Sequence, residues 1–315
     1  MMNLLIIHMG YPKAGSTFLQ KKLFPQLSKY EYLSDPLKYK KINRLKKEIF
    51  YTRDTVPNDE YIESFAYELN KTIVESIKTD FIFSAEAICN FYRFNGELNL
   101  INLSKVIKIL QKNNSITIKL LSIIRRQDEM LHSVFSYSYD IFRNDYKDIN
   151  YFITDLEESK FNQLVRYLDY SKIQQHFINE NNIKVCFLLF EDLVNNPTKF
   201  LKDINYFIEN GLDLKNINTE VVNSNSINDK KIINSQKFYL LLRLHLYLKK
   251  YSGYRFLMPP RLRNAFKKNN LLNPKTFSQM DKENVDLVLK KYREANISFA
   301  NNNDCYDQMI QYKYI

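Results

Sequence analysis

The sequence contains no tryptophan, four histidines and three cysteines, and these shortages exclude several kinds of site. Cys89, Cys186 and Cys305 are odd in number and far apart, which suits neither a disulfide framework nor a metal site. No group of histidines, cysteines and carboxylates has metal-ligand spacing, so we expect no metal. Free cysteines of this kind indicate a reducing compartment.

Long apolar runs are also absent. Residues 4–9 form an apolar run that is too short for a signal peptide and has no basic segment before it. No stretch reaches the roughly 18 apolar residues that a membrane span requires. The Leu-rich segment 238–248 is short and contains Arg243 and His245, which favours a packed helix. We therefore predict a cytoplasmic protein without a membrane span.

The chain is rich in apolar side chains and in positive charge. Its 315 residues are 45% hydrophobic and 14% aromatic, enough for one large α/β domain with a sizeable core. A net charge of +11 suits an anionic cofactor, an acidic glycan, nucleic acid or an anionic membrane surface. One basic run, which we interpret as a solvated helix face rather than a rim for an anionic acceptor, comprises Lys38, Lys40, Lys41, Arg44, Lys46 and Lys47.

Two of the five glycines, Gly10 and Gly15, lie in one short segment near the start. The apolar residues 4–9 predict a buried strand before this segment, and residues 16–24 have the apolar spacing of a helix after it. The first N–H groups of a helix lack partners and carry partial positive charge, so they bind anions well. Lys13 adds a full charge. The segment is therefore predicted to be a phosphate-binding loop.

This loop differs from a Walker A loop. Gly10 and Gly15 have the Walker spacing, but Ser16 stands where the Walker lysine belongs and the lysine is at position 13. No strand ends in an aspartate of the Walker B kind. An ordinary ATPase or GTPase is disfavoured, and the simplest alternative is a glycine turn before a surface helix.

Polar residues follow the next predicted strands. The strand at 80–86 ends on Glu86, and the strand at 115–124 is followed by Arg125 and Arg126. Ligands bind beyond the carboxyl ends of parallel strands, where Glu86 could reach a substrate hydroxyl. The same residue could instead stabilise a helix N-terminus through the helix dipole, and its position does not decide between the two roles.

Arg125 and Ser133 could together hold a phosphate. A helix predicted over 127–142 carries Ser133 eight residues after Arg125. A guanidinium offers a bidentate fork and a hydroxyl a further donor, so the two can converge on one phosphate. Adjacent arginines on an extended segment point to opposite sides, so only one of the pair faces a ligand. The spacing to Ser133 favours Arg125.

These motifs resemble those of sulfotransferases that use 3′-phosphoadenosine 5′-phosphosulfate (PAPS). Residues 12–20 resemble the 5′-phosphosulfate loop, and Arg125 with Ser133 resembles the 3′-phosphate site, although Met130 stands where many relatives carry a second arginine. A strand at 184–190, followed by Glu-Asp-Leu and then by Asn-Pro at the start of a helix to about 211, resembles a late core element with a mostly structural role. The resemblance covers most of the chain and is strongest to bacterial carbohydrate sulfotransferases.

The resemblance implies transfer of a sulfuryl group from PAPS to a carbohydrate hydroxyl. It implies that Lys13 stabilises the leaving group and that Glu86 is the general base. A polar loop at 221–231 would close over the nucleotide. The residues assigned to PAPS are Lys13, Ala14, Gly15, Ser16, Thr17, Arg125, Ser133, Lys230 and Lys231.

The predicted fold class is α/β, a P-loop-like parallel sheet flanked by helices. We predict a single sulfotransferase-like domain over 1–315, with added helical segments at about 36–80 and 230–300. The partner is expected to be a glycan or another hydroxyl-bearing acceptor and not a nucleic acid, and the oligomeric state stays open. The alternatives are a kinase-like phosphoryl transferase that requires ATP and Mg²⁺, and a non-enzymatic basic protein that binds nucleic acid or an anionic polymer.

Overall fold

The computed structural model describes most of the chain, with several gaps. The described residues are 3–52, 57–113, 115–142, 145, 146, 148–156, 158, 161–209 and 279–315. They all belong to one compact unit, Met1–Val222 with Gln279–Ile315. A second unit, Asn223–Ser278, lies outside the described residues, and so do Lys230 and Lys231. The single-domain organisation therefore stays a prediction.

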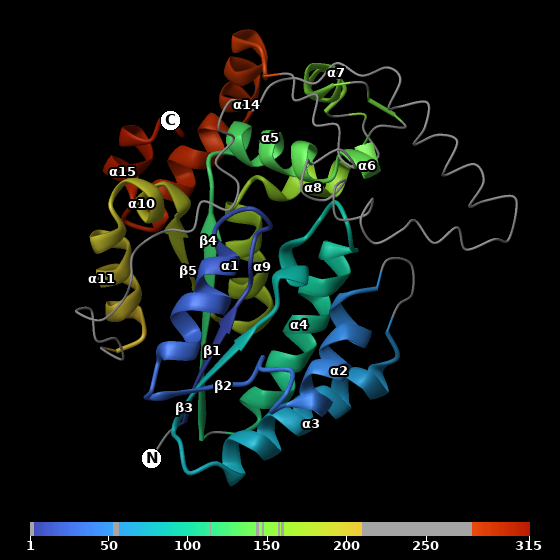
Figure 1. Cartoon of the computed structure of the whole chain (residues 1–315), viewed down its shortest axis with the longest axis vertical. Coiled ribbons are helices and arrows are strands. Elements are labelled where there is room, and N and C mark those ends of the chain that lie inside the picture. The colour runs from blue at the N-terminus through green and yellow to red at the C-terminus, as the bar shows by residue number, and fades with distance from the viewer. Residues whose placement is uncertain are drawn as a thin grey trace, which may run out of the picture. The chain divides into compact units, whose positions relative to one another are not determined.

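A five-stranded parallel sheet forms the centre of the described unit, with the strand order β2-β3-β1-β4-β5 (Figure 1). Its strands are β1 Asn3–His8, β2 Tyr30–Tyr32, β3 Asp80–Ser84, β4 Ile116–Ile124 and β5 Val185–Leu189. β1 lies between β3 and β4, and its apolar residues are buried, as expected for a central strand covered on both faces. The predicted α/β fold with a parallel sheet flanked by helices is confirmed.

Helices pack against the sheet and against one another. α4 contacts β4, α2, α3 and α9, and α11 contacts β5. The helices before β4 are α1 Ser16–Phe18, α2 Lys40–Phe50, α3 Asp59–Glu75 and α4 Gly96–Gln111. Those between β4 and β5 are α5 Gln127–Tyr137, α6 Tyr139–Phe142, α7 Ile149–Thr154, α8 Asn162–Tyr167 and α9 Ser171–Asn181. After β5 follow α10 Phe190–Asn195, α11 Pro197–Phe207, α14 Lys282–Asn302 and α15 Tyr306–Gln311.

Two predicted helices are present, but their bounds differ from the predicted ones. Asn196 caps α11 by accepting the backbone N–H of Lys199, and Pro197 is the first helical residue, as predicted, but α11 ends at Phe207 rather than near 211. The helix predicted over 127–142 is interrupted at Ser138, between α5 and α6. Serine favours helix ends over helix interiors because its side chain competes for backbone hydrogen bonds.

The basic run at 38–47, most of which lies on α2, is solvated with one exception. Lys38, Lys40, Lys41, Arg44 and Lys47 are exposed, as predicted. Lys46 points inward instead, with its Nζ 5.8 Å from the ring centre of the buried Phe83, and burial lowers the pKa of Lys46 to about 8. For Lys46 the prediction was wrong, because helical spacing turns this position toward the sheet. Among the helices of the described ranges, none is long and apolar enough to cross a membrane.

Candidate active site

The loop after β1 has the tight backbone that its glycines predict. A Cβ on Gly10 would clash with Ser16 Oγ, and one on Gly15 would lie 2.8 Å from Leu193 Cδ2. Gly15 also has φ +88°, in the left-handed region. Lys13 is left-handed as well, with φ 65°. A non-glycine residue in that region costs of order 1–3 kcal/mol. Asn182, Glu209, Asp304 and Lys313 share this conformation away from the loop, so it does not by itself mark a functional site.

The helical segment that begins at Ser16 gives the loop an end suited to an anion. α1 continues directly into a π-turn at Leu19–Leu23 and a 3₁₀-turn at Phe24–Gln26. The first N–H groups of such a segment have no acceptor within it. The Ser16 hydroxyl is buried and donates to the carbonyl of Tyr11 at 3.2 Å, whereas Thr17 is exposed. Ala14 is buried in the loop. The backbone and Thr17 are therefore the better candidates for contacts to a phosphate.

Lys13 belongs to the loop, and its side chain reaches α5. Its Nζ is 3.9 Å from the ring centre of Tyr137, at the end of α5, which is a favourable cation–π distance. Burial raises the pKa of Glu86, and the positive charge of Lys13 opposes that rise, so the two groups interact. The Lys13 carbonyl accepts a hydrogen bond from Arg125 Nη1 at 3.3 Å.

Glu86 lies against the loop, at the carboxyl end of β3. It is the first residue of a 3₁₀-turn, Glu86–Cys89, and a Cβ on Gly10 would come within 3.3 Å of its Cα. Burial raises the pKa of Glu86, and the charge of Lys13 opposes that shift. A carboxyl with a raised pKa beside a cation can accept a proton more readily than an ordinary glutamate. The sequence predicted its place at the sheet edge; its role as a base stays a prediction.

Two tyrosines that the sequence analysis did not single out accompany Glu86. Burial raises the pKa of Tyr51 and of Tyr92, and the negative charge of Glu86 adds to both shifts. Tyr51 follows α2, and a contact with the backbone of Ala87 opposes the rise in its pKa. With 23 tyrosines in the chain, the sequence contains no signal that separates these two from the rest.

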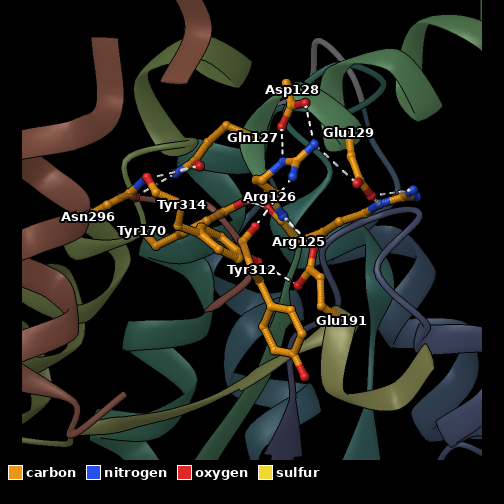
Figure 2. Close-up of polar contacts among 10 residues, drawn as sticks. All are labelled: Arg125, Arg126, Gln127, Asp128, Glu129, Tyr170, Glu191, Asn296, Tyr312 and Tyr314. Atoms are coloured by element: carbon orange, nitrogen blue, oxygen red, sulfur yellow. Dashed lines mark hydrogen bonds and ion pairs between the residues drawn. The ribbon is translucent and has the colours of Figure 1, made fainter. Parts of the chain in front are cut away.

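Arg125 follows β4, and its guanidinium contacts the loop backbone at Lys13. Figure 2 shows its side chain beside Glu129. Its Nε and Nη2 lie 3.2 and 3.0 Å from Glu129 Oε2, and its guanidinium is 4.7 Å from the ring centre of Phe190. The carbonyl of Arg125 accepts a hydrogen bond from the hydroxyl of Tyr170. Arg125 therefore lies beside the loop, with the Glu129 carboxylate occupying part of its guanidinium, and its role in holding a phosphate stays a prediction.

Arg126 shares Glu129 with Arg125, with its Nη2 3.3 Å from Glu129 Oε1, and has further partners of its own (Figure 2). Its Nε and Nη2 lie 2.7 and 2.9 Å from the two oxygens of Asp128. Its backbone N–H donates to Glu191 Oε1 at 2.9 Å, and the other oxygen of Glu191 accepts from the hydroxyl of Tyr314 at 2.8 Å. Arg126 Nη1 lies 3.4 Å from the carbonyl of Tyr312. Arg126 thus joins the C-terminal segment to the site, and Glu191 has the structural role predicted for it.

Ser133 shares one face of α5 with two residues that contact the site. Glu129 and Tyr137 stand four residues before and after it, and side chains four apart are neighbours on a helix. Glu129 contacts Arg125, and Tyr137 contacts Lys13. The half-buried Ser133 therefore lies on the face of α5 that borders the loop.

His8 does not fit the role of a base. It is fully buried at the end of β1, out of reach of a substrate, and burial lowers its pKa to about 3, so it is a weak base. His8 Nδ1 lies 2.8 Å from Ser84 Oγ, to which Gln20 Nε2 also donates at 2.9 Å. These contacts connect the helix after the loop to β1 and β3, which is a structural role.

Comparison with known proteins gives one structural likeness to report. No protein-family model and no curated protein matches the sequence. The structure is similar to the crystal structure of a sulfotransferase from Alicyclobacillus acidocaldarius, with a TM-score of 0.39 and 12% identity. The match covers 78% of this chain and 91% of that chain.

Proposed function

We propose that the protein transfers a sulfuryl group from PAPS to a hydroxyl of a carbohydrate acceptor. One observation carries this proposal: Lys13, Glu86 and Arg125 come from separate segments and meet at one edge of the sheet. Arg125 Nη1 donates to the Lys13 carbonyl at 3.3 Å, and Glu86 lies against Gly10 of the same loop. All three belong to the segments in which the sequence resembles the sulfotransferase motifs.

The reaction needs little covalent chemistry from the protein. The acceptor oxygen forms a bond to sulfur while the bond between sulfur and the 5′-phosphate oxygen breaks. The charge that develops on that oxygen would be stabilised by Lys13 and by the N–H groups of Gly15, Ser16 and Thr17. The hydroxyl proton would pass to Glu86. The product is 3′,5′-bisphosphorylated adenosine.

Donor selection would fall to the other side of the loop. Arg125 and Ser133 would hold the 3′-phosphate, which distinguishes PAPS from ATP. Lys230 and Lys231 would contribute further phosphate contacts in a single domain over 1–315. A carbohydrate is proposed as the acceptor because residues 84–86 resemble the position from which carbohydrate sulfotransferases supply their base.

The test is transfer of labelled sulfur. The full chain is incubated with [³⁵S]PAPS and a panel of glycans, with and without Mg²⁺, beside matched reactions with γ-³²P-labelled ATP. We expect Mg²⁺-independent transfer of ³⁵S to at least one glycan. Mg²⁺-dependent transfer of ³²P would instead support the kinase-like alternative. Salt-sensitive binding of polymers without transfer of either label would support a non-enzymatic binder.

A further inference from the structure

Arg93 is a half-buried arginine in the segment between β3 and α4. Its Nε is buried and has no hydrogen-bond partner among the described residues. Its guanidinium also forms no ion pair with any of them, whereas Arg125, Arg126 and Arg166 each pair with a carboxylate. Arginine is rarely buried unless it is paired, so this position calls for an anion that the described side chains do not supply.

The turn that carries Arg93 lies near Glu86. The backbone N–H of Arg93 donates to Asn90 Oδ1 at 3.2 Å, and the N–H of Phe94 donates to the Asn90 carbonyl at 3.1 Å. The ring centres of Phe94 and Tyr51 are 5.3 Å apart. Burial raises the pKa of Tyr51, and the negative charge of Glu86 adds to that rise. Tyr51 is therefore close both to Glu86 and to the turn.

Tyr92 is close to both charged groups. Burial raises the pKa of its hydroxyl, the charge of Arg93 opposes that rise, and the charge of Glu86 adds to it. The cation whose charge acts on Glu86 itself is Lys13. The guanidinium of Arg93 and the carboxyl of Glu86 thus lie on the same edge of the sheet without neutralising each other.

The strand order places Arg93 on the acceptor side of the loop. Glu86 and Arg93 follow β3, the loop follows β1, and Arg125 follows β4. Because β1 lies between β3 and β4, the loop separates Arg93 from Arg125. In the proposed function the 3′-phosphate of the donor is on the β4 side and the acceptor hydroxyl on the β3 side. An anion at Arg93 would therefore belong to the acceptor.

We propose that Arg93 binds an anionic group of the acceptor, so that the acceptor is an acidic sugar whose carboxylate or sulfate ester contacts Arg93 while its hydroxyl faces Glu86. The inference rests on the proposed function, which places the acceptor at Glu86. A guanidinium presents two parallel N–H donors to two oxygens of such a group, and Nε is one of the donors. The net charge of +11 would also attract an acidic glycan to the protein.

Matched pairs of oligosaccharides test this assignment, because only the anionic group differs within a pair. Oligogalacturonides are compared with their carboxyl-reduced counterparts, and sulfated carrageenan oligosaccharides with their desulfated counterparts. Calorimetry without nucleotide at physiological ionic strength measures affinity, and transfer of ³⁵S from PAPS measures kcat/KM. We expect the acidic member of at least one pair to bind about tenfold or more tightly than its neutral counterpart. The pair that shows the preference distinguishes a carboxylate from a sulfate ester.

Three variants assign that preference to one side chain. Arg93→Gln should abolish it, mainly because the acidic member loses affinity. Arg93→Lys keeps the charge without the planar fork and should retain part of it. Arg44→Gln is the matched control, since Arg44 is exposed on α2 and has no ion pair with a described residue. This variant makes the same change of net charge, and the preference should stay within about twofold of wild type because exposed charges contribute little.

The proposal is wrong if the wild type prefers neither acidic oligosaccharide, or if Arg44→Gln loses the preference as Arg93→Gln does. A thermal melt checks the fold of each variant. Arg93→Gln should melt at or above the wild-type temperature, because it removes an uncompensated charge.

The two levels of hypothesis fail differently. If ³⁵S is transferred to neutral oligosaccharides as fast as to acidic ones, in the wild type and in Arg93→Gln alike, the proposed function stands and the role of Arg93 is wrong. If no glycan receives ³⁵S but acidic oligosaccharides bind in a manner that depends on Arg93, the proposed function fails and the anion site remains.

Discussion

The two cationic groups that flank the loop have opposite surroundings. The ammonium of Lys13 lies over an aromatic ring, and its charge reaches the half-buried carboxyl of Glu86, whose pKa is raised by burial. The guanidinium of Arg125 is held by an ion pair to Glu129 and by the loop backbone. The Lys13 side therefore contains a carboxyl with a shifted pKa, whereas the Arg125 side is a network of ion pairs.

The difference suits the chemistry of the two side chains. Arginine stays charged and offers a planar fork for a phosphate, whereas lysine presents a compact charge that can follow a developing anion. Within the proposed function, chemistry would occur on the Lys13 side and donor selection on the Arg125 side. Mutations on the first side should then change turnover, and mutations on the second side should change nucleotide preference.

The largest effect is expected for Glu86→Gln. If Glu86 accepts the proton of the acceptor hydroxyl, turnover should fall by about 10²–10⁴-fold, because the amide keeps the shape but not the basicity. Affinity for 3′,5′-bisphosphorylated adenosine should stay nearly unchanged. Steady-state kinetics and calorimetry measure the two quantities. A folded variant with wild-type turnover would leave Glu86 with only the role of a residue at a helix start.

The pH profile of the wild type gives a second test of Glu86. A general base must be ionised, so kcat/KM should fall as the pH drops through the pKa of Glu86. Burial raises that pKa above the ordinary value of 4.5, so the acid limb should lie above the range of an ordinary glutamate. Loss of this limb in Glu86→Gln would support the assignment, and an unchanged limb would contradict it.

Lys13→Ala should have the next largest effect on turnover. If the ammonium stabilises the leaving group, turnover should fall by about 10²–10³-fold while donor affinity falls less. The same variant should raise the pKa of Glu86 further, since the lysine charge now lowers it. Carboxyl ¹³C NMR titration of Glu86 in the wild type and the variant would measure that shift. Wild-type turnover in Lys13→Ala would mean that the loop is misassigned.

Arg125→Ala should act on preference rather than on the chemical step. A charge-assisted contact to phosphate contributes about 1.5–3 kcal/mol, so most of the preference for the 3′,5′-bisphosphate over 5′-AMP should disappear. Arg126→Ala is the comparison, because Arg126 pairs with the buried Asp128 and the C-terminal segment. We expect it to lower the melting temperature more and the preference less. The reverse ranking would exchange the roles of the two arginines.

The sequence was sufficient to predict the sheet and the residues at its edge. Short apolar runs and the polar residues after them located β1, β3, β4 and β5, because parallel strands are buried along their whole length. The sequence did not predict that the segment 301–315 would pack against the core. Tyr314 is nevertheless buried, and its hydroxyl donates to Glu191. That contact joins residues 123 positions apart, and a polar tail with scattered aromatics has no periodicity that reveals it.

The candidate site residues that directly follow a strand could be predicted from the sequence. Those that contact the site from one face of a helix could not. Lys13, Glu86 and Arg125 each follow a strand, so topology alone brings them to one edge. Glu129 and Tyr137 lie on α5, whose rotation about its axis is set by packing. The sequence of this helix is similar to that of other amphipathic helices, and nothing in it distinguishes Glu129 and Tyr137 from the other polar residues.

Tyr137→Leu should produce the smallest effect. It tests whether Tyr137 acts with Lys13 on turnover or with Arg125 on nucleotide preference. Removing the ring under the Lys13 ammonium loses a cation–π contact of about 0.5–1 kcal/mol at an exposed site, and the ring of Tyr137 is 56% exposed. Turnover should therefore fall about two- to fivefold, while the preference for the 3′,5′-bisphosphate stays the same. Tyr137→Phe is the matched control, since it keeps a ring under the ammonium and should stay near wild-type turnover. If both variants instead lose preference and keep turnover, Tyr137 belongs with Arg125 on the donor-selecting side, and the division between the two sides of the loop is wrong.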